Sequence, residues 1–326
     1  MARVHFLTVG NGDCTIIEHN SGHITVIDIC GGNRQSISKE EASFSEALNK
    51  PRGNFAMCKK PTNPIEYLKS LGVSSIWRFI LTHPDMDHMD GLDNLATNFS
   101  IINYWDTGAR KEKPDFTGAP FKEEDWDRYI KIRDGKEANT TVVTPLAGHR
   151  FQYANKGVSE DTSGDGLYIS SPDSNLIKEA NESEDFNDSS YIISYYSVGG
   201  KIILPGDAHD KSWELAIDQY EDDIKDATFL LAPHHGRKSG RDYSYLDTVR
   251  PRVSLLGCAR SEHLAYQAWS SRDLEYFTQN QTGNVVLEIS TDRIDVYIEN
   301  DSFANKAGGN TDITNKEGYF LLGSIT

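Results

Sequence analysis

THPDMDHMDG, at residues 82–91, holds four side chains that can bind a metal ion within six positions: His83, Asp85, Asp87 and His88. Alternate residues of an extended segment project to the same side, so His83, Asp85 and Asp87 face one way, and a turn would bring His88 to them. Imidazole suits Zn, Fe or Mn, and added carboxylates shift the preference toward Mn, Fe or Mg. The apolar run 76–81 directly before this stretch is predicted to be a strand. We therefore expect a metal site at the end of that strand; the alternative is a solvated acidic loop.

Two later stretches carry the same residue types at predicted strand ends. LPGD, at 204–207, places the Asp207 carboxylate beside a glycine, where it can bridge two cations. PHHG, at 233–236, holds His234 and His235, whose side chains point to opposite faces if the chain is extended, so one could bind metal while the other faces substrate. Each has an ordinary alternative, because Gly-Asp ends many strands and paired histidines often lie on the surface. Open sheets gather ligands at the carboxyl ends of their strands, so we expect all three stretches to meet.

The rest of the chain alternates β-rich runs with segments of helical periodicity, which predicts one α/β domain over residues 1–326. Two polar segments, at about 31–63 and 108–186, are predicted to be insertions. We predict strands at 4–9, 14–18, 23–29, 76–81, 101–105, 191–198, 201–204, 227–231, 253–257, 285–289 and 294–298, and helices at 64–71, 92–98, 123–132, 213–224 and 271–279.

Composition excludes several classes of protein. The 33 Lys and Arg residues against 49 Asp and Glu residues give a net charge of −16, which excludes a generally basic protein that coats nucleic acid but leaves room for a metal that meets phosphate. The four cysteines are scattered without a CxxC pair, so no disulfide framework is expected. No run approaches the ~18 apolar residues of a membrane helix, and the first residues lack a signal-peptide stretch. We expect a cytoplasmic protein without membrane insertion.

This set of motifs resembles the metallo-β-lactamase superfamily, whose loop signature is His-x-His-x-Asp-His, followed by a later strand-end Asp and His. The closer likeness is to the ComEC-type hydrolase domain of bacterial DNA uptake, which has Asp in place of the second His, as at Asp85. The resemblance covers about 1–30, 64–107 and 187–300. The further matching motifs are GNGD at 10–13, a strand-end Asp at 28, NDSS at 187–190, GD at 206–207 and PHHG at 233–236.

The resemblance implies a four-layer αββα sandwich with a dinuclear metal site on its edge. It assigns His83 and Asp85 to the first metal, and Asp87, His88 and His234 to the second, with Asp207 as the bridge. The family usually has a His on the strand before Gly-Asp as the third ligand of the first metal. This chain has no His there, and Asp188 is the nearest candidate, with Asn187 or a water as alternatives.

These residues predict a hydrolase that uses a hydroxide activated by two divalent cations, Zn or Mn. Two cations can clamp both oxygens of a displacement at phosphorus, so we expect a phosphodiester substrate: nucleic acid, nucleotide or lipid head group. Asp87 is expected to orient the hydroxide and His235 to contact the phosphate, as the catalytic residues. Lys238 and His263 are further candidates for substrate binding. The alternatives are a thioester, lactone or β-lactam hydrolase, and a non-catalytic binding module whose first metal site has decayed.

Overall fold

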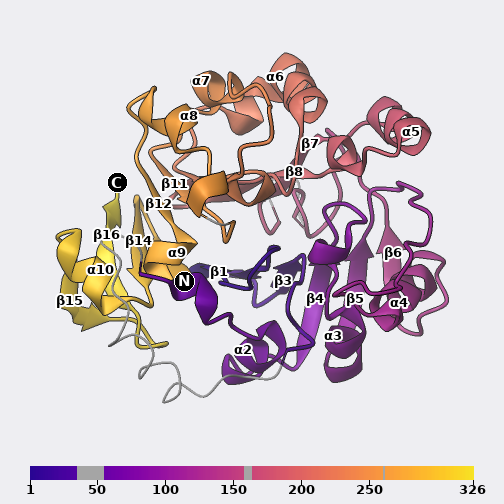
Figure 1. The fold of residues 1–326 in the computed structure, drawn as a ribbon, viewed down its shortest axis with the longest axis horizontal. Coiled ribbons are helices and arrows are strands. Elements are labelled where there is room, and N and C mark those ends of the chain that lie inside the picture. Colours follow the sequence, from indigo (N-terminus) through magenta and orange to yellow (C-terminus); the bar gives the residue numbers. More distant parts are fainter. Residues whose placement is uncertain (35–54, 158–163, 260) are drawn as a thin grey trace.

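The computed structural model describes residues 1–34, 55–157, 164–259 and 261–326. Two β-sheets face each other, and helices cover the outer side of each sheet (Figure 1). The larger sheet has ten strands in the order β15-β16-β14-β13-β1-β2-β3-β4-β5-β6, and the smaller has six in the order β12-β11-β10-β9-β8-β7, counted over the described residues. The four-layer α/β arrangement expected from the sequence is confirmed.

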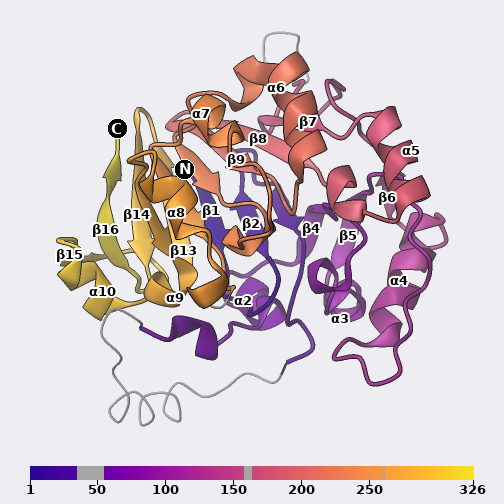
Figure 2. The same ribbon diagram turned by 45° about the horizontal axis from the view of Figure 1, so that its top comes forward.

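The strands that pair along the larger sheet come from both ends of the chain. β1, β2 and β3 run antiparallel, β3 to β6 run parallel, and β13 pairs with β1, so the C-terminal strands extend the sheet beyond the N-terminus (Figure 2). In sheet order the strands are β15 (Asn310–Thr314), β16 (Phe320–Ile325), β14 (Arg293–Ile298), β13 (Val285–Ser290), β1 (Ala2–Phe6), β2 (Thr15–Glu18), β3 (Ile24–Ile27), β4 (Ser75–Ile80), β5 (Ser100–Trp105) and β6 (Thr141–Val143).

The smaller sheet is parallel from β9 to β12, while β7, β8 and β9 are antiparallel neighbours. The turn at Gly199-Gly200, predicted from the sequence, joins β8 to β9 as expected. In sheet order the strands are β12 (Tyr276–Thr278), β11 (Val253–Leu256), β10 (Phe229–Leu231), β9 (Gly200–Leu204), β8 (Ile192–Ser197) and β7 (Leu167–Ser171).

Three apolar clusters hold the four layers together. One lies between the sheets, where the rings of Phe6 and Phe229 stack at 5.3 Å between centroids. A second packs α2 (Pro64–Ser70), α3 (Leu92–Asn98) and α4 (Glu123–Arg133) on the larger sheet. The third packs α6 (Asp210–Ile224), α7 (Tyr245–Val249) and α8 (Tyr266–Ser270) on the smaller sheet. The remaining helices among the described residues are α5 (Ser174–Ser183), α9 (Gln279–Thr282) and α10 (Asp301–Lys306).

Local signals explain where the elements begin. Helix α2 starts with Pro64, and the side chain of Asn63 accepts hydrogen bonds from the backbone N–H groups of Ile65 and Glu66. Both features satisfy or remove donors that the first helical turn leaves free. Among the described residues, no helix is long and apolar enough to cross a membrane; α6, with 15 residues, falls short of the ~20 that a span needs.

Residues 271–279, 108–186 and 31–63 compare with their sequence predictions as follows. The helix predicted at 271–279 is wrong: α8 ends at Ser270, and β12 pairs in parallel with β11, so sheet pairing overrides a weak helical pattern. The segment 108–186 supplies α4 and α5 and also the edge strands β6 and β7 of the two sheets, so it takes part in both. Of the polar segment 31–63, residues 35–54 lie outside the described residues, and η1 (Met57–Lys59) is a short 3-10 turn.

Candidate metal centre

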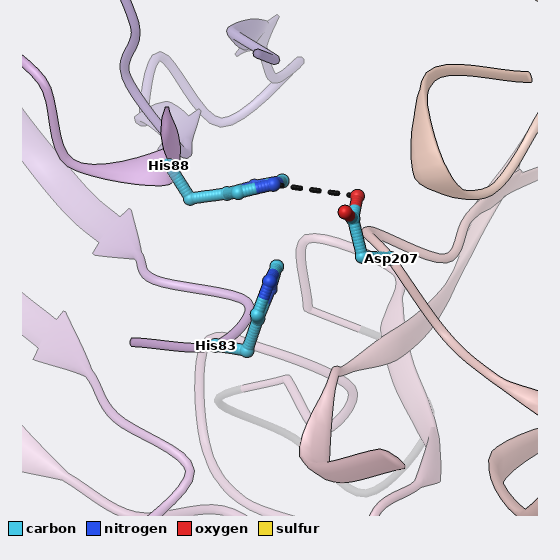
Figure 3. A group of neighbouring side chains, drawn as sticks. All are labelled: His83, His88 and Asp207. Carbon is cyan, nitrogen blue, oxygen red and sulfur yellow. Dashed lines mark ion pairs between the residues drawn. The ribbon is translucent and has the colours of Figure 1, made fainter. Parts of the chain in front are cut away.

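The three stretches singled out in the sequence converge at one edge of the sandwich, at the carboxyl ends of β4, β9 and β10. Figure 3 shows the imidazoles of His83 and His88 turned toward the Asp207 carboxylate, which comes from the facing sheet. Three groups of side chains each bring ligand atoms within 4.8 Å of one another. The groups are His83, His88 and Asp207; Asp87, His88 and His235; and Asp13, Asp207 and His235.

Close backbone packing joins these strand ends. The backbone N–H of His234 donates to the Gly206 carbonyl at 3.0 Å, which brings the end of β10 to the end of β9. Gly206 has φ 51°, and a Cβ there would lie 2.5 Å from the Ser190 hydroxyl and 2.8 Å from Thr82. Any larger residue would push the Asp207 loop away from the end of β4, so glycine is required at this position.

Two of the histidines have a hydrogen-bond acceptor behind the ring. His88 Nδ1 lies 2.7 Å from Asp28 Oδ2. The Thr82 hydroxyl donates to the same Asp28 oxygen at 2.7 Å, so its own oxygen is free to accept from His83 Nδ1 at 3.1 Å. Each ring is thereby held with hydrogen on Nδ1, which leaves the Nε2 lone pair facing the site.

His235 also has a carboxylate close to Nδ1, in an ion-pair contact without hydrogen-bond geometry. Its Nδ1 lies 3.1 Å from Asp13 Oδ1, and its Nε2 lies 3.5 Å from Asp87 Oδ2 and 3.6 Å from Asp207 Oδ2. A carboxylate behind the imidazole is the usual support of a metal-binding histidine. We call His83, His88 and His235 the acceptor-backed histidines.

Five atoms of the site that could bind a metal ion are buried and have no hydrogen-bond partner among the described residues. They are Nε2 of the three acceptor-backed histidines, Asp13 Oδ2 and Asp207 Oδ1. Buried polar atoms are normally hydrogen-bonded, so five orphans facing one another require an explanation. Bonds of about 2.0–2.1 Å to one tetrahedral cation would put ligand atoms roughly 3.3 Å apart. His88 Nε2 and Asp207 Oδ1 are 3.3 Å apart, so these residues fit a divalent cation.

Electrostatics agree with this assignment. Burial alone would lower the pKa of His235, but the carboxylates of Asp207 and Asp13 raise it to about 10. Burial is likewise outweighed at His88, where Asp207 and Asp28 hold the pKa well above its usual range. Burial would raise the pKa of Asp207, yet His235 and His88 hold it well below. A proton and a cation therefore compete for the Nε2 lone pairs of His88 and His235, and metal binding would release the proton.

His234 lies beside the groups and differs from its neighbour. Its Nε2 is 3.6 Å from Asp207 Oδ2, but its Nδ1 faces a donor, Nη2 of Arg241, at 2.5 Å. Burial lowers the pKa of His234 to about 4; the Asp207 carboxylate opposes this shift, and Arg241 adds a smaller lowering effect. The structure thus brings His235, rather than His234, into the groups of possible ligands.

Besides His234, two further predicted ligands, Asp85 and Asp188, lie outside these groups. Asp85 Oδ2 is 3.7 Å from His83 Nε2, and Asp85 Oδ1 pairs with the Lys111 ammonium at 2.6 Å. Asp188 is half-buried on η3 (Phe186–Ser189), and burial together with Asp185 raises its pKa to about 6. Their roles as ligands of a first metal stay predictions.

The two candidates for substrate binding lie on adjoining loops. The side chains of Lys238 and His263 are exposed, and the backbone N–H of Lys238 donates to the His263 carbonyl at 2.6 Å. This contact ties the loop after η4 (His234–Gly236) to η5 (Ser261–His263). Their part in substrate binding stays a prediction.

Sequence reasoning assigned no role to four residues that shape the site. Asp13 and Asp28 stood in the matched motifs, as the end of GNGD and as a strand-end carboxylate, and those motifs were the signal that could have found them. Thr82 precedes the first histidine, and its hydroxyl links Asp28 to His83 because it donates to Asp28 and accepts from His83 Nδ1. Arg241, seven residues after His234, carries no motif, and only the folded chain shows its contact.

Three solved structures with the same kind of fold share 10–12% sequence identity with this chain. Models of known families do not match it, and neither do curated protein sequences. Tm1679, a metal-dependent hydrolase of the β-lactamase superfamily, aligns over 89% of this chain and 100% of its own, with a TM-score of 0.48 and 11% identity. Igni18, a metallo hydrolase from the archaeon Ignicoccus hospitalis, aligns over 88% and 100%, with a TM-score of 0.47 and 12% identity. A diphosphatase of the PhnP family aligns over 89% and 99%, with a TM-score of 0.42 and 10% identity.

Proposed function

We propose that this chain is a hydrolase of the metallo-β-lactamase superfamily that binds two divalent cations, Zn or Mn, and cleaves phosphodiesters. The observation that carries the proposal is the set of buried possible ligand atoms without hydrogen-bond partners that meets at the carboxyl ends of β4, β9 and β10. Asp207 would lie between the two cations. The other residues that would hold them are His83, His88, His235 and Asp87, with Asp85 as a further candidate. Asp13 would support His235 from the Nδ1 side.

Bound cations would supply Lewis-acid polarisation of the substrate and lower the pKa of water at the site. The chain's own groups do the positioning. Asp87 is partly exposed, with 28% of its side chain accessible, so its carboxylate can reach both His235 and a water molecule on the open side. We infer that Asp87 orients the attacking water, as predicted from the sequence.

A phosphodiester suits the charges around this site. The whole chain has a net charge of −16, which opposes approach of an anion, so attraction has to be local. The cations would supply it, together with Lys111, Arg241 and Lys238 beside the three stretches. A nucleotide or lipid head group meets less repulsion from this acidic surface than a long nucleic acid does.

One observation favours the alternative of a binding module with a single cation. Lys111 pairs with Asp85 at 2.6 Å, so an ammonium group stands where the first metal would need a free carboxylate. A single-cation protein would keep His88, His235 and Asp207 and would have no pair of charges to clamp a displacement.

The test combines metal content with substrate choice. Protein reconstituted with Zn or Mn is analysed by mass spectrometry for ions per chain, and bis-nitrophenyl phosphate is compared with chromogenic esters and a thioester. We expect about two ions per chain and turnover of the phosphodiester. One ion without turnover would indicate the binding module, and faster cleavage of the esters would replace the phosphodiester assignment.

A further inference from the structure

Arg241 determines which nitrogen of His234 carries hydrogen. A guanidinium group only donates hydrogen bonds, so Nδ1 of His234, 2.5 Å from Arg241 Nη2, has to be the acceptor. Arg241 is itself held in place, because Nη1 donates to the Ala208 carbonyl at 2.8 Å. The lone pair of the neutral ring is therefore on Nδ1, and the hydrogen is on Nε2.

This arrangement is the reverse of that at the acceptor-backed histidines. There, Nδ1 faces a carboxylate or a hydroxyl oxygen, and Nε2 keeps its lone pair. An imidazole whose Nε2 carries hydrogen cannot bind a cation through that atom; it can only donate a hydrogen bond. His234 is thus unsuited to the ligand role that the family resemblance implies for it.

The backbone separates the two neighbouring rings. His234 and His235 have φ values of 52° and 57°, both in the left-handed region that non-glycine residues seldom adopt. Two such residues in succession turn the His235 ring inward, where it is fully buried, and leave His234 with 21% of its side chain exposed. Non-glycine residues held in this region are often found at functional sites.

The Nε2–H group of His234 lies at the accessible edge of the metal-ligand cluster. Nε2 lies 3.6 Å from Asp207 Oδ2, at the edge of the cluster and on its solvent-accessible side. A substrate that entered the site would therefore meet Nε2 of His234, which can donate a hydrogen bond and has the Arg241 guanidinium behind its ring. An anionic oxygen fits this pair, because hydrogen bonds to charged acceptors are about twice as strong as neutral ones.

We propose that His234 is a catalytic residue that donates a hydrogen bond from Nε2 to an anionic oxygen of the substrate, and that Arg241 is the positioning residue that fixes its tautomer. His235 then takes the ligand position. This inference rests on the proposed hydrolase function for its substrate, an oxygen of a phosphodiester, but the assignment of ligand and donor does not depend on which substrate is cleaved.

The experiment compares His234→Ala, His234→Gln and His235→Ala in protein reconstituted with Zn. We expect His234→Ala to retain the full metal content and to lose about 10²–10³-fold in kcat on bis-nitrophenyl phosphate, the loss seen when one preorganised donor is removed. His234→Gln should recover part of this loss, because its amide N–H can donate. His235→Ala should lose bound metal. Loss of metal from His234→Ala, with retention in His235→Ala, would overturn the proposal.

A second readout does not use activity. The ¹⁵N resonances of the His234 ring, assigned by their absence in His234→Ala, report which nitrogen is protonated in metal-free and in Zn-loaded protein. We expect a protonated Nε2 in both, and an Arg241→Met variant that loses this preference. A protonated Nδ1 in the wild type would contradict the proposal. If the wild type hydrolyses no phosphodiester, the proposed function fails, while the ring assignment and the metal content still decide this inference.

Discussion

His234 and His235 are neighbours in the chain, yet their rings have opposite surroundings. His235 is buried with a carboxylate, Asp13, behind it, and His234 is partly exposed with a guanidinium, Arg241, behind it. The residue type is the same, and so is the left-handed backbone. The group behind an imidazole therefore determines what its Nε2 atom can do. With a carboxylate behind it, Nε2 of His235 has a lone pair that can bind a cation; with a guanidinium behind it, Nε2 of His234 has a hydrogen that can be donated to an oxyanion.

The largest effect is expected from the carboxylate that both rings share. Asp207 lies within 3.6 Å of His234 and His235 and 3.3 Å from His88. Asp207→Ala should abolish hydrolysis and leave less than one cation per chain, since the proposed bridge is gone. Circular dichroism checks that the fold is retained. Unchanged turnover at saturating metal would remove the two-cation mechanism.

Changing the group behind each ring tests whether His234 and His235 differ in their contribution to metal binding. Asp13→Asn weakens the acceptor behind His235, and loss of such support lowers metal affinity by about 10–100-fold in other proteins. Titration calorimetry with Zn should show this decrease. Arg241→Met is the matched control, because loss of a positive charge behind His234 should not lower Zn affinity. Equal losses in the two variants would mean that the rings do not differ in role.

A smaller effect is expected where the family resemblance and this chain diverge. The Lys111 ammonium pairs with Asp85 at 2.6 Å, so Lys111→Met should free that carboxylate and raise the affinity for the first metal, the one that His83 and Asp85 would bind, several-fold. Lys113→Met is the control, since Lys113 pairs with Glu123 and Asp127 on the surface. A Lys111 variant that binds metal as the wild type does would show that Asp85 is not a ligand.

The smallest effect concerns a buried histidine away from the metal centre. Burial lowers the pKa of His19 to about 3, and its Nε2 contacts only the Thr25 hydroxyl at 2.9 Å among the side-chain hydrogen bonds described. The unfolded chain binds this proton first, so stability should fall as the pH drops from about 6.5 toward 3, by at most about 1.4 kcal/mol per pH unit. Denaturant unfolding of His19→Gln should show a weaker pH dependence than the wild type. An unchanged slope in His19→Gln would contradict the assignment.

Much of the fold and the location of the site could be predicted because their signals are local. Pro64 begins a helix, Gly199-Gly200 turns a hairpin, and the stretch 82–91 follows an apolar strand. The convergence of the three stretches followed from one rule about the carboxyl ends of strands. These features depend on a few adjacent residues each, so a single sequence can reveal them.

The remainder depends on contacts between distant parts of the chain. Residues 271–279 form a turn and an edge strand because β11 is there to pair with them, and no local pattern marks that neighbour. The roles of His234 and His235 depend on two φ values and on Arg241, which no motif identifies. Sequence reasoning assumed an extended chain at that pair and therefore could not decide which ring turns inward.

The most direct test is a crystal structure of the Zn-loaded protein with anomalous diffraction data at the zinc edge. The account predicts anomalous peaks about 2.0–2.1 Å from Nε2 of His235 and of His88, and none at that distance from His234, whose Nδ1 still faces Arg241. A zinc ion bound to Nε2 of His234, with the His235 ring free of metal, would contradict it.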